Sequence, residues 1–172
     1  LFKIPGAVAK ALALEGKIID IANNITKSNS CLYLGRGPLY PLSLEGALKL
    51  KEVSYIHAEG FSAGEMKHGP IALIEEGLPV ISLLAKDHHS IKTISNLREA
   101  LARGAKLIIF ADEGTENNID FAHEIIRLPF LNESITPIIA SIPIQLLAYH
   151  TAVAKGTDVD QPKNLAKSVT VE

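Results

Sequence analysis

The chain has 172 residues and a net charge of −2, with 47% hydrophobic and 21% charged residues. These values are ordinary for one globular domain, and the small, scattered charge offers no basic surface to nucleic acid or to an anionic membrane. The single cysteine, Cys31, excludes a disulfide within the chain and indicates a reducing compartment such as the cytoplasm. Because the chain begins with Leu1 rather than Met, we expect it to be a fragment of a longer polypeptide.

Strand-like and helix-like segments alternate along the chain, which predicts an α/β fold with a mainly parallel sheet of four to five strands. The expected elements, in chain order, are helices at 4–12 and 18–25, a strand at 31–34, a helix at 41–56, a strand at 79–84, a helix at 91–103, strands at 106–110 and 124–128, and a helix at 134–155. Pro143 lacks the amide hydrogen that a helix interior needs, so we expect it to kink or break the last helix. Ligands of such sheets bind beyond the carboxyl ends of the strands, which points to residues 35–40 and 57–70 as the region of the chemistry.

Two glycines, Gly35 and Gly37, follow the first expected strand and suggest a dinucleotide-binding loop. That motif needs a third glycine three residues later, where this chain has Tyr40. We therefore reject a nucleotide site and expect the glycines to let the backbone turn sharply at the end of the strand.

Glu45, Lys49 and Glu52 share one face of the helix expected at 41–56, because they are spaced four and three residues apart. The other faces are rich in apolar residues, so we expect the helix to be largely buried. One interpretation is a solvated Glu-Lys-Glu ladder that contributes about 0.2–0.5 kcal/mol per pair. The other is a carboxylate base that a lysine holds beside a pocket, and spacing alone favours the ladder.

His57 and Glu59 match the first half of the zinc deaminase signature, but the second half needs two cysteines and the chain has one. A metal cluster of His57, Glu59 and His68 would lack helical ligand spacing, so polar residues at the end of a helix are the better interpretation. We expect no metal and no cofactor. His68 itself lies in a loop bounded by glycine and proline, where a histidine titrates near neutral pH and can move protons.

The last segment, 156–172, follows a long apolar stretch that Gly156 terminates, and it is too short to form a core of its own. Within it Lys167 stands between Ala166 and Ser168. A lysine on such a tail could be a Schiff-base nucleophile, because imine formation needs an amine that can approach a carbonyl and hold it. Taken by itself, it could equally be a solvated C-terminal lysine.

Three stretches together resemble one enzyme family closely: LEGALKLKEVSYIHAEGFSAGEMKHGPIALIEEGLPVI at 44–81, QLLAYHTAVAKGTDVDQPKNLAKSVTVE at 145–172, and LGRG at 34–37. The whole chain resembles the C-terminal half of the isomerase region of glutamine–fructose-6-phosphate aminotransferases (isomerizing), also called glucosamine-6-phosphate synthases. The resemblance implies a sugar isomerase (SIS) domain over 1–155 that includes an N-terminal connecting helix. It implies a three-layer, flavodoxin-like α/β sandwich, followed by a catalytic tail at 156–172.

The resemblance also implies roles for individual residues. Lys167 would form the imine with the C2 carbonyl of open-chain fructose 6-phosphate, with Ala166 and Glu52 also at the substrate. Glu52 would be the base that moves a proton between C1 and C2, and Lys49 and Glu45 would organise the site.

His68 would help to open the sugar ring and would reach into the active site of the neighbouring subunit of a homodimer. The partners that the resemblance implies are the sugar phosphates fructose 6-phosphate and glucosamine 6-phosphate, together with glutaminase and first SIS domains on the same polypeptide. Nucleic acid and membranes are not among them. Residues 35–40 carry no hydroxyl before Tyr40, so we expect the preceding SIS domain to recognise the phosphate and this chain alone to be inactive.

Two alternatives stay open. The chain could be a non-catalytic SIS module that senses sugar phosphate or mediates dimerisation, although such a module need not retain Glu52, His68 and Lys167 together. It could also come from an aldose–ketose isomerase that uses no ammonia and has no attached glutaminase.

Overall fold

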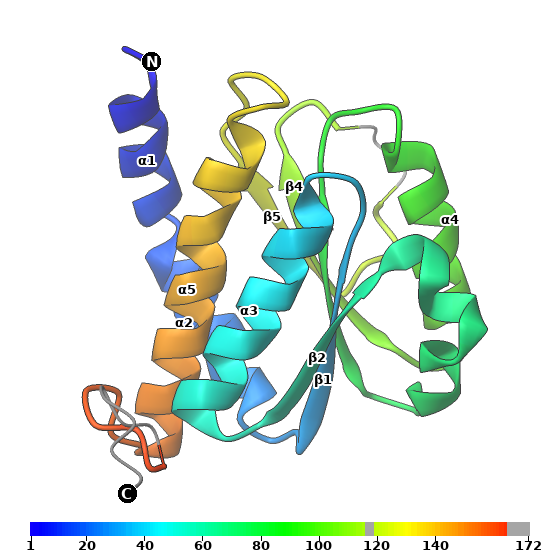
Figure 1. Ribbon diagram of the computed structural model, residues 1–172, viewed down its shortest axis with the longest axis vertical. Coiled ribbons are helices and arrows are strands. Elements are labelled where there is room, and N and C mark those ends of the chain that lie inside the picture. The colour runs from blue at the N-terminus through cyan, green and yellow to red at the C-terminus, as the bar shows by residue number, and fades with distance from the viewer. Residues whose placement is uncertain (116–118, 165–172) are drawn as a thin grey trace, which may run out of the picture.

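The computed structural model describes residues 1–115 and 119–164 (Figure 1). Its sheet has five strands in the order β2-β1-β3-β4-β5, and every neighbouring pair is parallel. The strands are β1 (Ser30–Gly35), β2 (His57–Ser62), β3 (Pro79–Leu84), β4 (Lys106–Asp112) and β5 (Glu124–Leu128). This order is that of flavodoxin-like folds, with the direction of winding reversed between β1 and β3, so the predicted fold class is confirmed.

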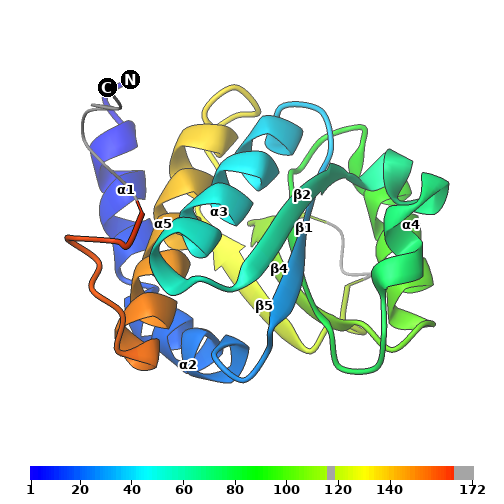
Figure 2. The same ribbon diagram turned by 60° about the horizontal axis from the view of Figure 1, so that its bottom comes forward.

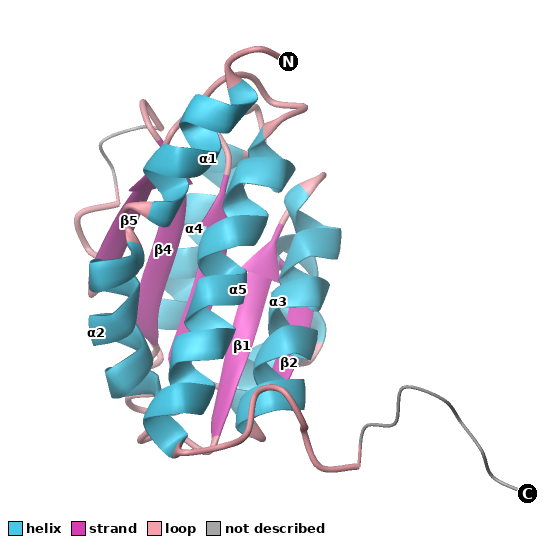
Figure 3. Ribbon diagram, turned by 90° about the vertical axis from the view of Figure 1, so that its left-hand side faces the viewer, coloured by secondary structure: helices cyan, strands magenta, loops and turns pink. Residues whose placement is uncertain are grey.

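Helices cover both faces of the sheet and make three layers. They are α1 (Ile4–Leu12), α2 (Glu15–Ile25), α3 (Leu39–Ser54), α4 (Ser90–Leu101) and α5 (Thr136–Lys155), with 3₁₀ turns η1 (Ala63–His68) and η2 (Pro70–Leu73). Figures 1 and 3 show α2, α3 and α5 on one face and α4 on the other. Helix α1 packs against α5, and η1 packs against α4. The stretch 44–81 therefore places α3 on one face of the sheet and η1 on the other.

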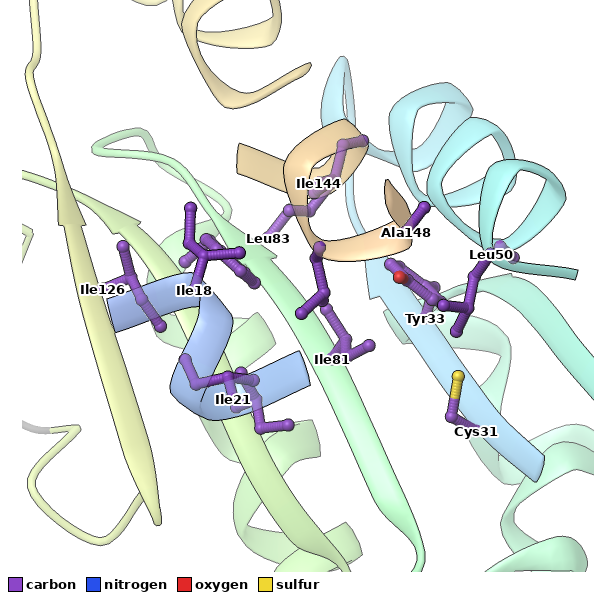
Figure 4. Close-up of a cluster of buried hydrophobic side chains, with 14 of the residues drawn as sticks. Ile18, Ile21, Cys31, Tyr33, Leu50, Ile81, Leu83, Ile126, Ile144 and Ala148 are labelled. Carbon is purple, nitrogen blue, oxygen red and sulfur yellow. The ribbon is translucent and has the colours of Figure 1, made fainter. Parts of the chain in front are cut away.

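The core consists of two buried layers, because alternate residues of each strand face opposite helices. Tyr33, Ile81 and Phe110 face α2, α3 and α5, where Figure 4 shows Tyr33 and Ile81 together with Leu50 of α3 and Ile144 of α5. A second layer faces α4 and includes Leu32, Leu34, Val80, Leu107 and Leu97. Because a parallel sheet is covered on both sides, its central strands are apolar throughout, and this made β1, β3 and β4 predictable.

Strand β2 corrects the sequence interpretation, which placed His57 and Glu59 at the end of a helix. They lie on the edge strand β2, whose residues pair in parallel with β1 from Ser30↔His57 to Gly35↔Ser62. The segment His-Ala-Glu-Gly-Phe-Ser has little intrinsic β preference, so pairing with β1 and packing against α3 decide its conformation. Residues 64–70 were expected as a loop, and they lie instead in two consecutive 3₁₀ turns, η1 and η2.

Helix α5 runs through Pro143 without a break, so of the two expected outcomes, a kink or a break, the break does not occur. Pro143 is itself buried, and α5 packs against α1, α2 and α3, so the tertiary contacts of the helix outweigh the one hydrogen bond that proline cannot donate. In length and apolar composition α5 would suffice to cross a membrane, but it is a core helix of this fold (Figure 1).

Candidate functional site

The outer face of α3 brings together the three charged residues that share a helix face in the sequence. Lys49 Nζ lies 2.7 Å from Glu52 Oε2, and both side chains are partly exposed. The hydrogen bond to Glu52 raises the pKa of Lys49, partial burial opposes this, and the negative charges of Glu52 and Glu45 add to the increase. Lys49 is therefore a persistent cation between two carboxylates.

Helix α3 is less buried than expected. Leu44 is 43% exposed and Leu48 is 40% exposed, while Gly46, Ala47 and Leu50 face the core. The outer face of α3 thus combines two exposed leucines with the charged set around Lys49.

A hollow of about 190 Å³ opens beside Lys49, between α3 and α5. Its lining comes from three segments: Lys49 and Val53 of α3, Gln145, Ala148 and Tyr149 of α5, and Val159 and Asp160 of the C-terminal segment. Complete small-molecule pockets commonly enclose about 300–1,000 Å³. The hollow therefore has room for part of a ligand, and further protein surface would have to enclose the rest.

The C-terminal segment is bound to the end of α3 before it leaves the described part of the chain. Gly156 ends α5 with a left-handed backbone (φ +71°), and Thr157 Oγ1 then donates to the carbonyl oxygen of Val53 at 2.6 Å. The backbone amide of Lys163 donates to the hydroxyl of Tyr55 at 2.8 Å. The ammonium of Lys163 lies 4.4 Å from the centre of the Tyr55 ring. Figure 3 shows this segment crossing the lower end of α3.

Tyr55 caps α3 in the left-handed region, with φ 59°. A left-handed backbone costs a residue with a Cβ atom about 1–2 kcal/mol, which is why glycine usually occupies this position. The residue in this unfavourable conformation, Tyr55, is the one whose hydroxyl and ring contact Lys163. The predicted substrate residues Ala166 and Lys167 come three and four residues after Lys163, and they lie outside the described residues.

His68 lies apart from Glu52. It ends η1, on the face of the sheet that α4 covers, and its side chain is exposed. Lys67 Nζ pairs with Glu99 Oε1 of α4 at 2.7 Å and fastens this turn. Within one chain, therefore, the structure brings together Glu45, Lys49 and Glu52 but not His68 (Figure 2 shows α3 and α4 on opposite sides of the sheet).

His57 and Glu59 point the same way from β2, with His57 Nε2 and Glu59 Oε1 3.7 Å apart and both side chains largely exposed. Among residues 1–115 and 119–164, no three His, Cys, Asp or Glu side chains gather in a way that could hold a metal ion.

Gly35, the last residue of β1, and Gly37 serve a tight turn at the end of the strand, as predicted. Gly37 has φ +56°, and a Cβ atom there would lie 2.8 Å from Cδ2 of His89. A Cβ atom at Gly35 would overlap the carbonyl oxygen of Leu39. Loop 35–40 is therefore held against the first turn of α3 and against the loop that follows β3.

Sequence reasoning missed a small cavity of about 80 Å³ at this switch point, where the first turns of α3, α4 and α5 converge. Its lining is Pro38, Leu39, Ala85, Asp87, His88, His89, Glu133, Thr136 and Pro137. Thr136, which lines the cavity, donates a hydrogen bond through Oγ1 to Oδ2 of the buried Asp112, and this oxygen also accepts one from the Lys86 amide. Burial raises the pKa of the Asp112 carboxyl. A carboxylate that ends an apolar strand was the available sequence signal.

Cys31 is fully buried on β1, and burial raises the pKa of its thiol to about 12. A thiol with this pKa is protonated at neutral pH and is not a nucleophile. Cys31 is therefore a residue of the core and not of a catalytic site.

The chain is similar to known proteins over its whole length. A family model of the SIS domain matches residues 24–155. Glutamine–fructose-6-phosphate aminotransferases (isomerizing) from Rhizobium meliloti (strain 1021) and Bradyrhizobium diazoefficiens are 53% and 54% identical over the whole chain. The chain spans less than a third of these relatives, 29% and 28% of their lengths.

Solved structures of similar proteins have the same fold. The C-terminal domain of glucosamine-fructose-6-phosphate aminotransferase from Francisella tularensis matches 92% of this chain with a TM-score of 0.89 and 43% identity, and the match covers 45% of that structure. Tagatose-6-phosphate ketose/aldose isomerase from Escherichia coli shares the fold at 19% identity, with a TM-score of 0.75 over 96% of this chain and 47% of that one.

Proposed function

The chain belongs to the SIS domain family, and on that premise we propose that it is the C-terminal part of the isomerase region of a glutamine–fructose-6-phosphate aminotransferase (isomerizing). Relatives of that name are 53–54% identical over its full length. The observation that carries the proposal is the arrangement on α3: the Lys49–Glu52 pair lies beside a hollow that the C-terminal segment also lines. The segment that bears Lys167 thus begins at the same place as the proposed base.

The proposed reaction starts with the amine of Lys167, which condenses with the C2 carbonyl of open-chain fructose 6-phosphate and releases water. The imine makes the hydrogens on C1 acidic, so a carboxylate can remove one of them. Ammonia from glutamine replaces the lysine amine at C2. Glu52 removes the proton from C1 and returns it to C2, which leaves the amine on C2 and forms the aldehyde at C1.

Lys167 must be neutral to attack a carbonyl. At neutral pH this requires the pKa of Lys167 to fall, through removal from water or through a nearby cation. Lys49 supplies such a cation, because its own ammonium is held by Glu52 and is not lost near neutral pH. Lys49 therefore has two proposed tasks: to orient Glu52 and to disfavour a second ammonium beside it.

The rest of the site would come from outside this chain. Loop 35–40 offers no hydroxyl to a phosphate before Tyr40, so we propose that a preceding SIS domain binds the phosphate. His68, on the opposite face of the sheet, would serve the active site of a second subunit in a homodimer. The glutaminase that supplies ammonia would lie earlier on the same polypeptide, and we expect the enzyme to act in the cytoplasm.

The test is reduction with borohydride of the full-length polypeptide in the presence of fructose 6-phosphate, followed by peptide mapping. We expect a sugar adduct on Lys167 and its loss in Lys167→Arg, since a guanidinium does not form the imine. Lys163→Arg, four residues earlier, is the matched control and should still be labelled on Lys167.

An adduct on another lysine, or labelling that survives Lys167→Arg, would contradict the assignment. If no adduct forms and fructose 6-phosphate still binds without turnover, the chain is instead a sensing or dimerising SIS module. Isomerisation that proceeds equally well without glutamine or ammonia would indicate an aldose–ketose isomerase.

A further inference from the structure

Two non-glycine residues of the described chain have a left-handed backbone, Tyr55 (φ 59°) and Asn164 (φ 63°). They belong to segments more than a hundred residues apart, yet both lie at one contact: Tyr55 is a partner in it, and Asn164 directly follows the other partner, Lys163. Unfavourable backbone conformations persist where surrounding structure enforces them, and they concentrate at functional sites. Their coincidence at one exposed contact singles out this part of the molecule.

We propose that Tyr55 and Lys163 form a clamp that sets the position of the C-terminal segment on α3, and that both are positioning residues for the reaction of Lys167. The proposal rests on the proposed function and adds a task that the resemblance did not assign. Tyr55 makes two different interactions with one residue: its hydroxyl accepts the Lys163 amide, and its ring faces the Lys163 ammonium. Thr157 Oγ1, bonded to the carbonyl oxygen of Val53, fastens the start of the same segment.

The clamp lies close to the proposed base along the chain. Tyr55 follows Glu52 by three residues, which corresponds to about 4.5 Å along a helix axis. Lys167 follows Lys163 by four residues, so its Cα atom can lie at most about 14 Å from that of Lys163 even with the chain fully extended. Fixing Lys163 on Tyr55 therefore limits how far the residues after it can reach from this end of α3, the helix that also carries Glu52 and Lys49.

Confinement of this kind affects turnover more than binding. Holding a nucleophile near its target lowers the entropic cost of the reaction, and a misplacement of about 1 Å can reduce the rate about 100-fold. The phosphate of the substrate is proposed to bind elsewhere, so loosening the segment should leave the KM for fructose 6-phosphate largely unchanged. A purely structural contact would instead change the thermal unfolding temperature and leave kcat intact.

The decisive variant is Tyr55→Gly in the full-length polypeptide. Glycine is the preferred residue for a left-handed helix cap, so this change removes the clamp while it favours the end of α3. We expect the kcat for glucosamine 6-phosphate formation to fall by about tenfold or more, with KM changed by less than about threefold. The rate of borohydride labelling on Lys167 at saturating fructose 6-phosphate should fall in parallel.

Graded variants separate the two halves of the clamp. Tyr55→Phe keeps the ring and removes the hydroxyl, so its kcat should lie between wild type and Tyr55→Gly. Lys163→Arg keeps a cation over the ring and should restore most of the activity that Lys163→Met loses. Lys155→Met, which removes an exposed lysine at the end of α5, is the matched control and should remain within about twofold of wild type.

The two proposals fail in different ways. If Lys167→Arg abolishes labelling but Tyr55→Gly and Lys163→Met both keep kcat within about twofold, the clamp is wrong and the proposed function stands. A rise in KM with kcat intact would also overturn the clamp. If Lys167→Arg leaves labelling and turnover unchanged, the proposed function fails, and the clamp fails with it.

Discussion

Lys49 and Glu52 form an ion pair of 2.7 Å, one turn apart on the outer face of α3. Their side chains are 37% and 26% exposed, and pairs this open to solvent typically contribute about 0.2–1 kcal/mol to stability. The pair can therefore contribute little to holding the domain together. Its place beside the hollow lined by the C-terminal segment makes catalysis the more informative property to measure.

Glu52→Gln should abolish most turnover in the full-length polypeptide, because an amide keeps the shape of the side chain but cannot accept the proton. General acid–base catalysis commonly contributes about 10²–10⁴-fold, and we expect kcat to fall by this factor while fructose 6-phosphate still binds. Steady-state kinetics and sugar binding by calorimetry measure the two effects separately. Glu113→Gln, an exposed carboxylate after β4, is the control. Near-normal turnover in Glu52→Gln would mean that Glu52 is only a member of a solvated Glu-Lys-Glu ladder and not the base.

Lys49→Met should separate stability from activity. We expect the free energy of unfolding to change by less than about 1 kcal/mol, because the pair is partly exposed. Turnover should fall much further, because Glu52 loses its partner and the cation proposed to lower the pKa of Lys167 is removed. Denaturant unfolding and steady-state kinetics on the same protein provide the comparison. Equal, small effects on both would contradict a catalytic role for Lys49.

Gly46→Ala should destabilise the domain although alanine is the better helix former. A Cβ atom at Gly46 would lie 2.7 Å from the Tyr33 ring, and overpacking of this kind costs about 1–3 kcal/mol. The gain in helix propensity is about 0.8–1.0 kcal/mol, so the cost of the steric overlap should exceed it and the domain should lose stability. Gly16→Ala in α2 is the matched control: its Cβ would meet nothing within 4 Å, and it should stabilise. Denaturant midpoints test both, and a more stable Gly46→Ala would contradict this packing.

Cys31 should be unreactive in the folded protein at pH 8 and should react with a thiol reagent on unfolding, because its thiol is buried with a pKa of about 12. The folded pKa lies above the ordinary value of 9.0, so between these values the unfolded chain binds fewer protons. Stability should therefore fall as pH rises through this window, by at most about 1.4 kcal/mol per pH unit from this group. Cys31→Ala should show a shallower fall. Prompt native labelling would contradict the assignment.

Much of the fold could be predicted because its signals are local. The strands β1, β3 and β4 are short apolar runs, and the residues of α3 that meet around Lys49 are spaced by one helical turn. The long motif at 44–81 was part of the resemblance that implied a SIS domain, and the SIS family model matches residues 24–155. Periodicity and spacing concern residues within a few positions of one another, and these are the relationships that a sequence displays directly.

Other features depended on contacts between distant parts of the chain. Edge strand β2 forms because β1 lies beside it, α5 continues through Pro143 because three helices surround it, and His68 lies on the face opposite Glu52 because β2 carries it past the sheet edge. The contact between Tyr55 and Lys163 joins residues 108 positions apart. No local pattern encodes such pairings, because their free energy comes from surfaces that meet only after the chain has folded.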